Sequence, residues 1–371
     1  MPTCLSIVTH NTEYIENCVV DYVESKVVKR FGVLTKETRT STKPVPRRYL
    51  AGLSFGPSSS VLTQLLDNTA KYHASRKASS PFEPLVVHVD TDLSHSADAG
   101  DTSAQKVLAK YRERFPNISF ECVHLTKVLS IKTIDWSTLP ALEGGDDVEK
   151  LRRFFDALPS VSSRADILRL FIRHILLHVA IEKSYSALLL AHNTTTLASL
   201  TLAEVANGRG FAVPWQVNDG LFTVCTYEQD SEGPSKEVSK IQFPVYYPIR
   251  EVLKNEIVTY LELIPSLQEL IPSPDSTTTS VVSHKDLSIE EVMTRYFDNI
   301  EGPQSGIIAN VVRITGKLDR PVGSEFCRMC GITLDEDGDS RWAGELGDTE
   351  ETAGPRQSGK LCYGCKRSIN G

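Results

Sequence analysis

The chain has 371 residues, which is enough for two or three domains with a sizeable hydrophobic core. Hydrophobic residues make up 40% and charged residues 23%, which is ordinary for a soluble globular protein, and the net charge of −7 argues against a globally basic nucleic-acid binder. The sequence has no N-terminal apolar signal segment and no run of about 18 apolar residues, so it predicts neither secretion nor contact with a membrane.

The N-terminal part predicts a helix followed by a basic arm. From Tyr14 to Leu34, apolar residues recur at steps of three and four: Val19, Tyr22, Val23, Val27 and Phe31. A linker from Thr38 to Pro46 follows. The basic arm has eight cations against Glu37: Lys26, Lys29, Arg30, Lys36, Arg39, Lys43, Arg47 and Arg48. It is either a surface that contacts phosphates or a solvated linker.

From Tyr49 onward, short apolar strands alternate with longer amphipathic helices. Strands are predicted over Tyr49–Ser54, Leu85–Asp90, Ile118–Leu125 and Ala187–Ala191. Helices are predicted over Ser60–Ala74, Ala104–Arg114, Val148–Ala157, Arg164–Lys183 and Leu197–Ala206. This alternation predicts an α/β fold, a mostly parallel sheet with helices on both faces. The polar segment Ser273–Ser283 is expected to be an exposed loop.

The first predicted strand runs into a Ser/Gly loop and then a helix, the layout with which α/β proteins hold phosphate groups. The loop consists of Ser54, Phe55, Gly56, Pro57, Ser58 and Ser59. It contains no carboxylate and no lysine, and Phe55 and Pro57 stand where a tight phosphate cradle prefers glycine or a free N–H. We therefore expect a degenerate phosphate loop, which argues against ATP binding by this chain.

Two further loops follow predicted strands, where open parallel sheets bind their ligands. Asp90 suits either a contact with a ribose or adenine, or the cap of a turn. In the loop from Ala191 to Thr196, Asn193 or Thr194 suits a helix N-cap. His192 is either a substrate contact or a hydrogen-bonded structural histidine. None of these loops places a nucleophile beside a base, so no catalytic residue is assigned.

The helix that begins near Ser163 has a buried stripe of apolar residues: Ile167, Leu168, Phe171, Ile172, Ile175, Leu176 and Val179. Arg169 and Arg173 lie on the opposite side, and Arg164 stands at the start of the helix. Arginines that face a cleft suit a polyanion such as RNA. The alternative is a solvated face on which Asp166 pairs with Arg169.

The C-terminal part contains two Cys-x-x-Cys pairs, Cys327 with Cys330 and Cys362 with Cys365. Two such pairs supply the four thiolates of a structural zinc site, and metal is favoured over disulfides in a reducing cytosol. Between the pairs, the segment Asp335–Glu351 has eight acids against one arginine. The alternatives for the cysteines are a free-thiol pair or a redox pair that handles sulfur.

The segment Leu53–Ser60 resembles a degenerate form of the Ser-Gly-Gly-x-Asp-Ser loop of the PP-loop ATP pyrophosphatase superfamily. More narrowly, the chain resembles the cytoplasmic tRNA 2-thiolation protein 2 family. The segments that carry this resemblance are the loop, Ser163–Leu170, Leu190–Asn193 with Thr201–Phe211, Asn310–Leu318 and the terminal cysteine pairs.

This resemblance implies a PP-loop-like domain in the non-catalytic subunit of a cytoplasmic heterodimer that 2-thiolates the wobble uridine of tRNA. The implied partners are a catalytic PP-loop thiolase subunit, tRNA and a thiocarboxylated ubiquitin-like sulfur carrier. The loop aspartate of active superfamily members falls on Ser58, their second loop glycine on Phe55, and their later acids on Thr195 and Thr196. Both loops thus lack the carboxylates of active enzymes.

The residues expected to contact tRNA are Lys29, Arg30, Arg47, Arg48, Arg164, Arg169 and Arg173. We divide the chain into residues 1–48 (helix and basic arm), 49–318 (PP-loop-like α/β domain) and 319–371 (a small zinc-ribbon-like cysteine module with the acidic insert). Two other functions remain open: a self-sufficient, ATP-dependent tRNA adenylating thiolase, and a zinc-ribbon protein adaptor that binds no RNA.

Overall fold

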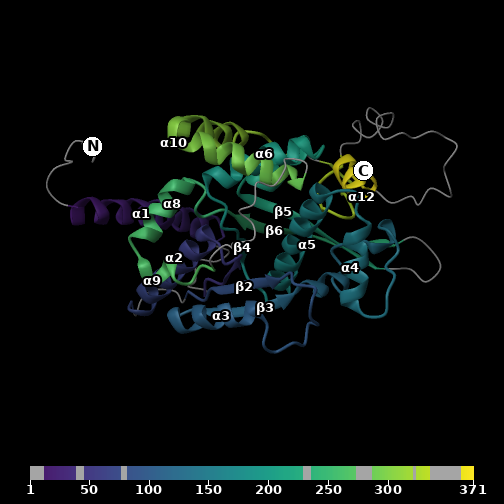
Figure 1. The fold of residues 1–371 in the computed structure, drawn as a ribbon, viewed down its shortest axis with the longest axis horizontal. Coiled ribbons are helices and arrows are strands. Elements are labelled where there is room, and N and C mark those ends of the chain that lie inside the picture. The colour runs from purple at the N-terminus through teal and green to yellow at the C-terminus, as the bar shows by residue number, and fades with distance from the viewer. Residues whose placement is uncertain are drawn as a thin grey trace.

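The computed structural model describes residues 12–38, 46–76, 82–228, 235–272, 286–320, 323–334 and 361–371. These residues contain one six-stranded sheet of order β3-β2-β1-β4-β6-β5. Its strands are β1 (Tyr49–Leu53), β2 (Leu85–Asp90), β3 (Ser119–His124), β4 (Ala187–Leu189), β5 (Gly220–Glu228) and β6 (Lys236–Tyr246). All neighbouring strands pair in parallel except β5, which runs antiparallel to β6 at the edge (Figure 1).

The helices follow the predicted alternation. They are α1 (Thr12–Glu37), α2 (Pro57–Ala74), α3 (Ser103–Arg114), α4 (Asp147–Ala157), α5 (Val161–Glu182), α6 (Thr194–Ala206), α7 (Val213–Val217), α8 (Lys254–Glu262), α9 (Pro265–Gln268), α10 (Ile289–Thr315) and α12 (Tyr363–Asn370). The predicted loop Ser273–Ser283, the acidic segment Asp335–Glu351 and most of the linker Thr38–Pro46 lie outside the described residues.

Both faces of the sheet are covered because successive side chains of a strand point to opposite sides. On β1, Leu50 packs into a core formed with α5, α6, α10 and α12, whereas Ala51 packs into a second core formed with α1, α2, α3 and α8. Val87 and Val86 of β2 divide in the same way. The predicted mostly parallel sheet with helices on both faces is confirmed.

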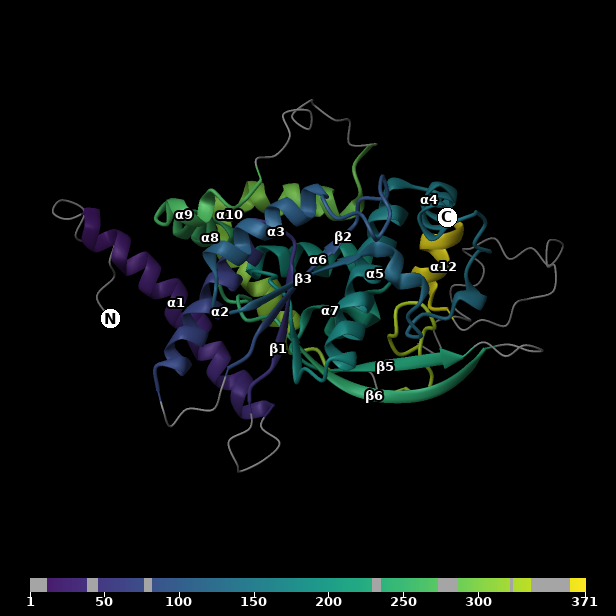
Figure 2. The same cartoon turned by 90° about the horizontal axis from the view of Figure 1, so that it is seen from below.

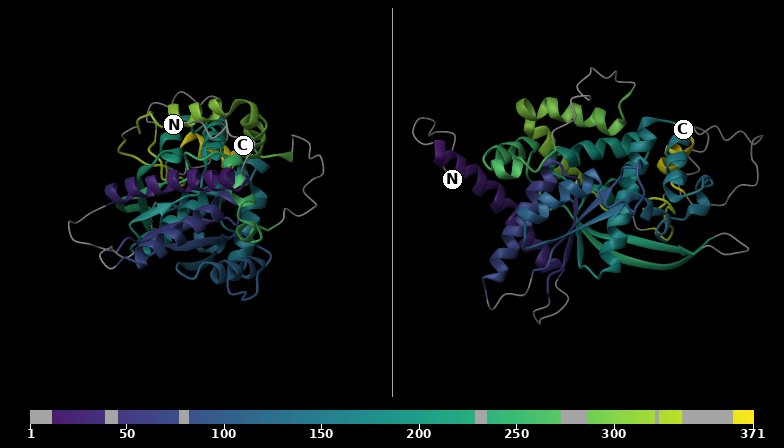
Figure 3. Two further views of the ribbon diagram at one scale, coloured as in Figure 1. Left: turned by 90° about the vertical axis from the view of Figure 1, so that its left-hand side faces the viewer. Right: turned by 60° about the horizontal axis from the view of Figure 1, so that its bottom comes forward.

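The hairpin of β5 and β6 was not predicted. Residues 236–242 of β6 are exposed on both faces, so they lack the apolar alternation by which a half-buried strand is recognised. The pair forms a curved ribbon that projects from the edge of the sheet (Figures 2 and 3). Helix α10 was not predicted either. It contains Pro303, and the non-helical backbone of Gln304 marks a kink there.

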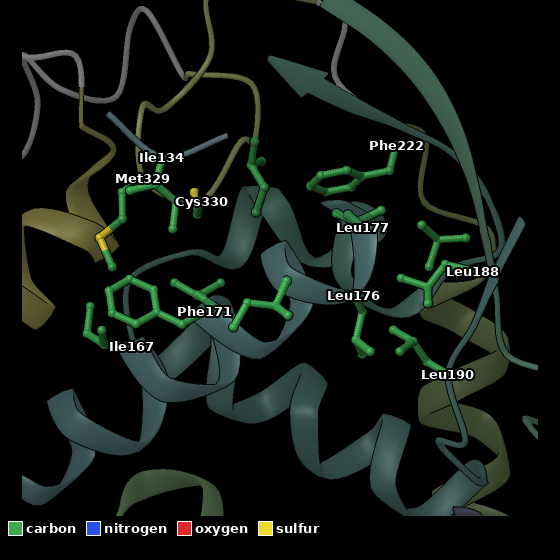
Figure 4. Packing of buried hydrophobic residues seen from close by; sticks show 14 of the residues in the cluster. Ile134, Ile167, Phe171, Leu176, Leu177, Leu188, Leu190, Phe222, Met329 and Cys330 are labelled. Atoms are coloured by element: carbon green, nitrogen blue, oxygen red, sulfur yellow. The ribbon is translucent and has the colours of Figure 1, made fainter. Parts of the chain in front are cut away.

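The first and last predicted segments are not separate from the central domain. Val23 and Val27 of α1 are fully buried in the core shared with α2 and α8. The cysteine segment enters the other core: Figure 4 shows Met329 and Cys330 close to Ile134 and Phe171. The divisions at residues 48 and 318 therefore mark changes in sequence character rather than independent cores.

Candidate functional site

The sheet reverses its strand order between β1 and β4, so the loops that follow these two strands lie side by side. Both loops are shorter than predicted. Helix α2 begins at Pro57, which suits a first helical position because its missing N–H needs no partner there. Helix α6 begins at Thr194 with Asn193 as its N-cap, which accepts a hydrogen bond from Thr196 N at 2.8 Å. The capping role predicted for Asn193 is confirmed.

The loop after β1 keeps a glycine-like backbone but carries an aromatic side chain. Phe55 has a φ of 59°, in the left-handed region that favours glycine. This conformation costs a residue with a side chain roughly 1–2 kcal/mol. The Phe55 ring stacks on the ring of His88 with 4.0 Å between the ring centres, which helps to offset that cost.

The hydroxyl groups of the loop bond to its own backbone. Ser54 N donates to Ser59 Oγ at 3.2 Å, and Gly56 N donates to Ser54 Oγ at 3.4 Å. Pro57 has no N–H to offer. Two N–H groups of the loop are therefore engaged and a third is missing, which leaves fewer donors for an anion than a working phosphate loop offers.

The second loop is tied to the first and to α10. Asn193 Nδ2 donates to Ser58 Oγ at 2.9 Å. Thr195 Oγ1 donates to the buried carboxylate of Glu301 at 2.5 Å and accepts from Lys254 N at 3.2 Å. The hydroxyl groups of Ser58 and Thr195, at positions where the sequence resemblance leads us to expect carboxylates, thus join structural hydrogen bonds.

These two loops line a cavity of about 510 Å³. Serine and threonine hydroxyls, Asn193, His88 and His192 form much of its polar wall. Among the described lining residues, Asp298 is the only carboxylate, and its Oδ2 lies 2.7 Å from Lys254 Nζ in an ion pair. The cavity can hydrogen-bond a polar group, but it lacks the carboxylates that hold magnesium beside a triphosphate.

His192 stands at the end of β4 as a neutral imidazole. Burial lowers its pKa to about 3, with further lowering by the charges of Arg169 and Arg173. Its ring meets the Tyr247 ring edge-on at 5.4 Å, and its Nδ1 has no hydrogen-bond partner among the described residues. Substrate contact by His192 stays a prediction.

Asp90, at the end of β2, caps the following turn. Its Oδ1 accepts a hydrogen bond from Asp92 N at 3.1 Å, which is the arrangement expected for turn capping. Its other oxygen lies 3.5 Å from His95 Nε2. These contacts favour the capping interpretation of Asp90 over contact with a ribose.

Arg169 and Arg173 do not form an exposed arginine stripe on α5, but the Asp166–Arg169 pair of the alternative interpretation is confirmed. Arg173 is only 7% exposed and donates to Gln216 Oε1 at 2.7 Å. Arg169 is held by Asp166 at 3.0 Å and by Glu204. The physical reason is that residues beyond α5 pack over this side and bring partners for the charges. Burial removes Arg173 from the candidates for tRNA contact.

Arg164 does stay exposed, at the start of α5. It lines a second cavity of about 760 Å³ together with Arg152, and its Nε donates to the Phe155 carbonyl at 3.0 Å. Thr91 and Thr294 belong to the walls of both cavities, so the two are neighbours. Arg164 keeps its predicted place beside a cleft, and its contact with tRNA stays a prediction.

Two of the four basic-arm cations that are expected to contact tRNA have structural partners. Arg30 forms ion pairs with Asp219 and, at 3.6 Å, with Glu251. Arg48 donates to the Lys183 carbonyl at 3.1 Å and lies over the Tyr185 ring. These side chains fasten the arm to the central domain, which neither of the two sequence interpretations anticipated.

The other two cations of the arm that are expected to contact tRNA, Arg47 and Lys29, make fewer contacts with the rest of the protein. Arg47 Nη1 lies 3.4 Å from His73 Nε2 and is partly buried. Lys29 is exposed on α1 and forms no ion pair with any residue that the structure describes. Lys29 is therefore the member of this set best placed to meet a phosphate, and its contact with tRNA stays a prediction.

The four C-terminal cysteines come together, as their spacing predicts. All four are buried, and their Sγ atoms lie within 4.8 Å of one another. Cys330 Sγ and Cys362 Sγ are 3.8 Å apart. A tetrahedral zinc with Zn–S bonds of about 2.3 Å holds its sulfurs about 3.8 Å apart, so the set fits one metal ion. The burial of all four argues against a free-thiol pair, whereas the redox-pair alternative stays untested.

The backbone around the cysteines also suits a metal. Cys362 N donates to Cys327 Sγ at 3.3 Å, as backbone amides do to metal-bound thiolates. Gly331 has a φ of 70° and donates through its N–H to the Cys327 carbonyl at 2.9 Å, which turns the chain back after Cys330. Sequence analysis missed Arg209, which lies beside this cluster, because nothing local marks it as buried.

Fold and site together define an α/β protein with a serine-rich loop at its switch point and a buried tetracysteine cluster. Residues 288–367 match the family model described as cytoplasmic tRNA 2-thiolation protein 2. The chain is 33% identical over 311 residues to the protein of that name from Sclerotinia sclerotiorum, covering 82% of this chain and 78% of the relative. It is 31% identical over 366 residues to the Phaeosphaeria nodorum protein, covering 95% and 89%.

The chain belongs to the cytoplasmic tRNA 2-thiolation protein 2 family. A solved structure of the U34-tRNA thiolase NcsA from Methanococcus maripaludis with its 4Fe-4S cluster is similar at a TM-score of 0.48 and 15% identity, over 89% of both chains. In the described part of the chain, no helix combines the length and apolar character needed to cross a bilayer.

Proposed function

We propose that this chain is the non-catalytic subunit of a heterodimer that 2-thiolates the wobble uridine of cytoplasmic tRNAs. Its partner subunit would carry the adenylation and sulfur-transfer chemistry, with sulfur from a thiocarboxylated ubiquitin-like carrier. Membership in the tRNA 2-thiolation family supports the pathway, and the names of its relatives agree with a cytoplasmic location. The role of this chain is to support the catalytic subunit and the bound tRNA.

The observation that carries the non-catalytic role is the chemistry of the switch-point cavity. Ser58 and Thr195 present hydroxyl groups where carboxylates are expected in an active enzyme, and both hydroxyls are engaged within the fold. Asp298 is neutralised by Lys254. Without free carboxylates the cavity cannot organise a magnesium-bound triphosphate for adenylation.

We also propose that the tetracysteine cluster holds one structural zinc ion. The buried sulfurs and their separation support a mononuclear site with no open position for a substrate. Zinc would contribute to folding because the four ligands come from segments far apart in the sequence. One equivalent of zinc in the purified chain, lost on treatment with a chelator together with a fall in Tm, is the expected result.

The decisive experiment is complementation of a strain that lacks this chain, with 2-thiouridine measured in its tRNA. We expect 2-thiouridine to be lost in the deletion and restored in full by the wild type and by Ser58→Ala. Ser58→Ala is the matched test because a loop residue needed for catalysis would not tolerate it. Unchanged 2-thiouridine in the deletion strain would refute a role in this pathway.

ATP–pyrophosphate exchange distinguishes the two enzymatic possibilities. We expect no exchange by the isolated chain, and exchange by the complex with its catalytic partner and tRNA. Exchange by the isolated chain would instead establish a self-sufficient adenylating thiolase. Absence of tRNA binding by both the chain and the complex would favour a zinc-ribbon protein adaptor.

A further inference from the structure

Arg209 is a fully buried cation at the centre of a charged network. Its Nε donates to Glu204 Oε2 at 2.9 Å, and its Nη2 donates to Asp166. Burial opposes its charge, and the ion pairs with Glu204 and Asp166 compensate that cost. The same two carboxylates bind Arg169, which lies 3.8 Å from Glu290 in the wall of the larger cavity.

The remaining donor of Arg209 faces the cysteine cluster. Its Nη1 lies 4.0 Å from Cys365 Sγ, within hydrogen-bonding range of a sulfur acceptor. On the same helix, Ser368 Oγ donates to Asp166 Oδ2 at 2.7 Å. The guanidinium group thus contacts the proposed metal ligand Cys365 on one side and the carboxylates of α5 and α6 on the other.

Glycines at and near the second cysteine pair leave room for the Arg209 side chain. A Cβ atom on Gly364 would lie 2.4 Å from Arg209 Cγ and 2.8 Å from the Asn207 carbonyl oxygen. Gly208 has a φ of 78°, and a Cβ atom there would lie 2.4 Å from the Tyr363 ring. Two glycines therefore make the close approach of α12 to Arg209 sterically possible.

Charge balance explains why a cation such as Arg209 would lie close to the cysteine cluster. When four neutral thiols bind a divalent metal ion they lose their protons, and the resulting centre carries a net charge of about −2. A buried anion is costly unless a cation or hydrogen-bond donor compensates it. Arg209 lies at the cluster, fully buried and paired with its two carboxylates.

We infer that Arg209 balances the charge of a metal–tetrathiolate centre at these cysteines, and that it transmits metal loading to α5 and α6 through Asp166 and Glu204. This inference rests on the metal site proposed above. Arg209 acts as a positioning residue: it neither binds the metal nor touches a substrate. Metal loading should therefore order the network that extends to Glu290.

The test compares Arg209→Lys with the matched control Arg250→Lys, in which a largely buried arginine that pairs with Asp219, away from the network, is changed. Each protein is loaded with Zn²⁺ and competed against a chromophoric chelator, and the S-to-Co²⁺ charge-transfer band is recorded after Co²⁺ loading. We expect Arg209→Lys to weaken metal affinity about 10- to 100-fold and to shift the Co²⁺ band, with the control close to wild type. Wild-type affinity in Arg209→Lys would overturn the inference.

The gain in Tm on adding Zn²⁺ distinguishes a charge-balancing role of Arg209 from a purely structural one. A structural loss lowers the Tm of the metal-free and metal-loaded forms equally, whereas loss of charge balance reduces the gain itself. If Arg209→Lys fails to fold, amide hydrogen exchange of the wild-type protein tests the inference instead. Added Zn²⁺ should increase amide protection in residues 163–169 and 203–209, and no change there would overturn the inference. A wild type that binds no metal refutes the metal proposal instead.

Discussion

The side-chain amide of Asn193 donates a hydrogen bond of 2.9 Å to Ser58 Oγ, and this contact joins the loop after β1 to the loop after β4. Ser58 stands at the position expected for the aspartate of an active phosphate loop. A residue that an ATP-using enzyme would turn toward metal and phosphate is here turned toward the neighbouring loop. The switch point is thereby held as a structural junction.

Asn193 should matter more for stability than Ser58, because it makes two bonds. Asn193→Ala removes both the cap of α6 and the bond to Ser58, so we expect the free energy of unfolding to fall by about 2 kcal/mol. Ser58→Ala removes one bond and should cost about 1 kcal/mol or less. Urea denaturation measures both, and equal losses would contradict the dual role of Asn193.

Gly364 is predicted to be intolerant of any side chain. A Cβ atom there would lie 2.8 Å from the Asn207 carbonyl oxygen, so we expect Gly364→Ala to lower the free energy of unfolding by about 1–3 kcal/mol. Gly306→Ala in α10 is the control because nothing lies within 4 Å of its added Cβ. It should gain about 0.5–1 kcal/mol from helix propensity. Thermal unfolding separates these opposite signs.

His192 should make the protein sensitive to acid. The unfolded chain binds a proton near pH 6.5, whereas the pKa of His192 in the folded protein is about 3. The contribution of neutral His192 to the free energy of unfolding is therefore fully present above pH 6.5. It is lost as the pH falls toward 3, a difference of a few kcal/mol. His192→Asn should flatten the dependence of unfolding free energy on pH over this range. A slope as steep as that of the wild type would rule out His192 as its source.

Lys29 should contribute to tRNA binding through phosphate contact. We expect Lys29→Glu to weaken binding and to lower the slope of log affinity against log salt concentration by about 1. Lys110→Glu, a charge reversal at another exposed lysine, on α3, serves as the control. Filter binding across a salt series gives both slopes, and identical behaviour of the two variants would remove Lys29 from the tRNA-binding surface.

The local spacing of apolar residues was sufficient to predict much of the fold. The strands β1, β2 and β3 and the helices α3 and α4 lie within one or two residues of their predicted ranges, because apolar spacing reports directly which face of an element is buried. The sequence also predicted that Cys327 and Cys330 lie beside Cys362 and Cys365, because two Cys-x-x-Cys pairs are typical of one four-thiolate metal site.

The sequence by itself determined the α/β layers, the loss of carboxylates from both loops and the identity of the cysteine cluster. Only the tertiary structure decided which charges face water. Arg169 and Arg173 fall on the polar side of α5, yet Arg173 is buried and Arg169 half-buried, because Glu204 and Gln216 reach them from 35 and 43 residues away in sequence. Arg209 is the same case: its partners Asp166 and Cys365 meet only in the folded chain. Helical periodicity separates apolar from polar faces, but the burial of a charge depends on partners that folding brings from distant segments.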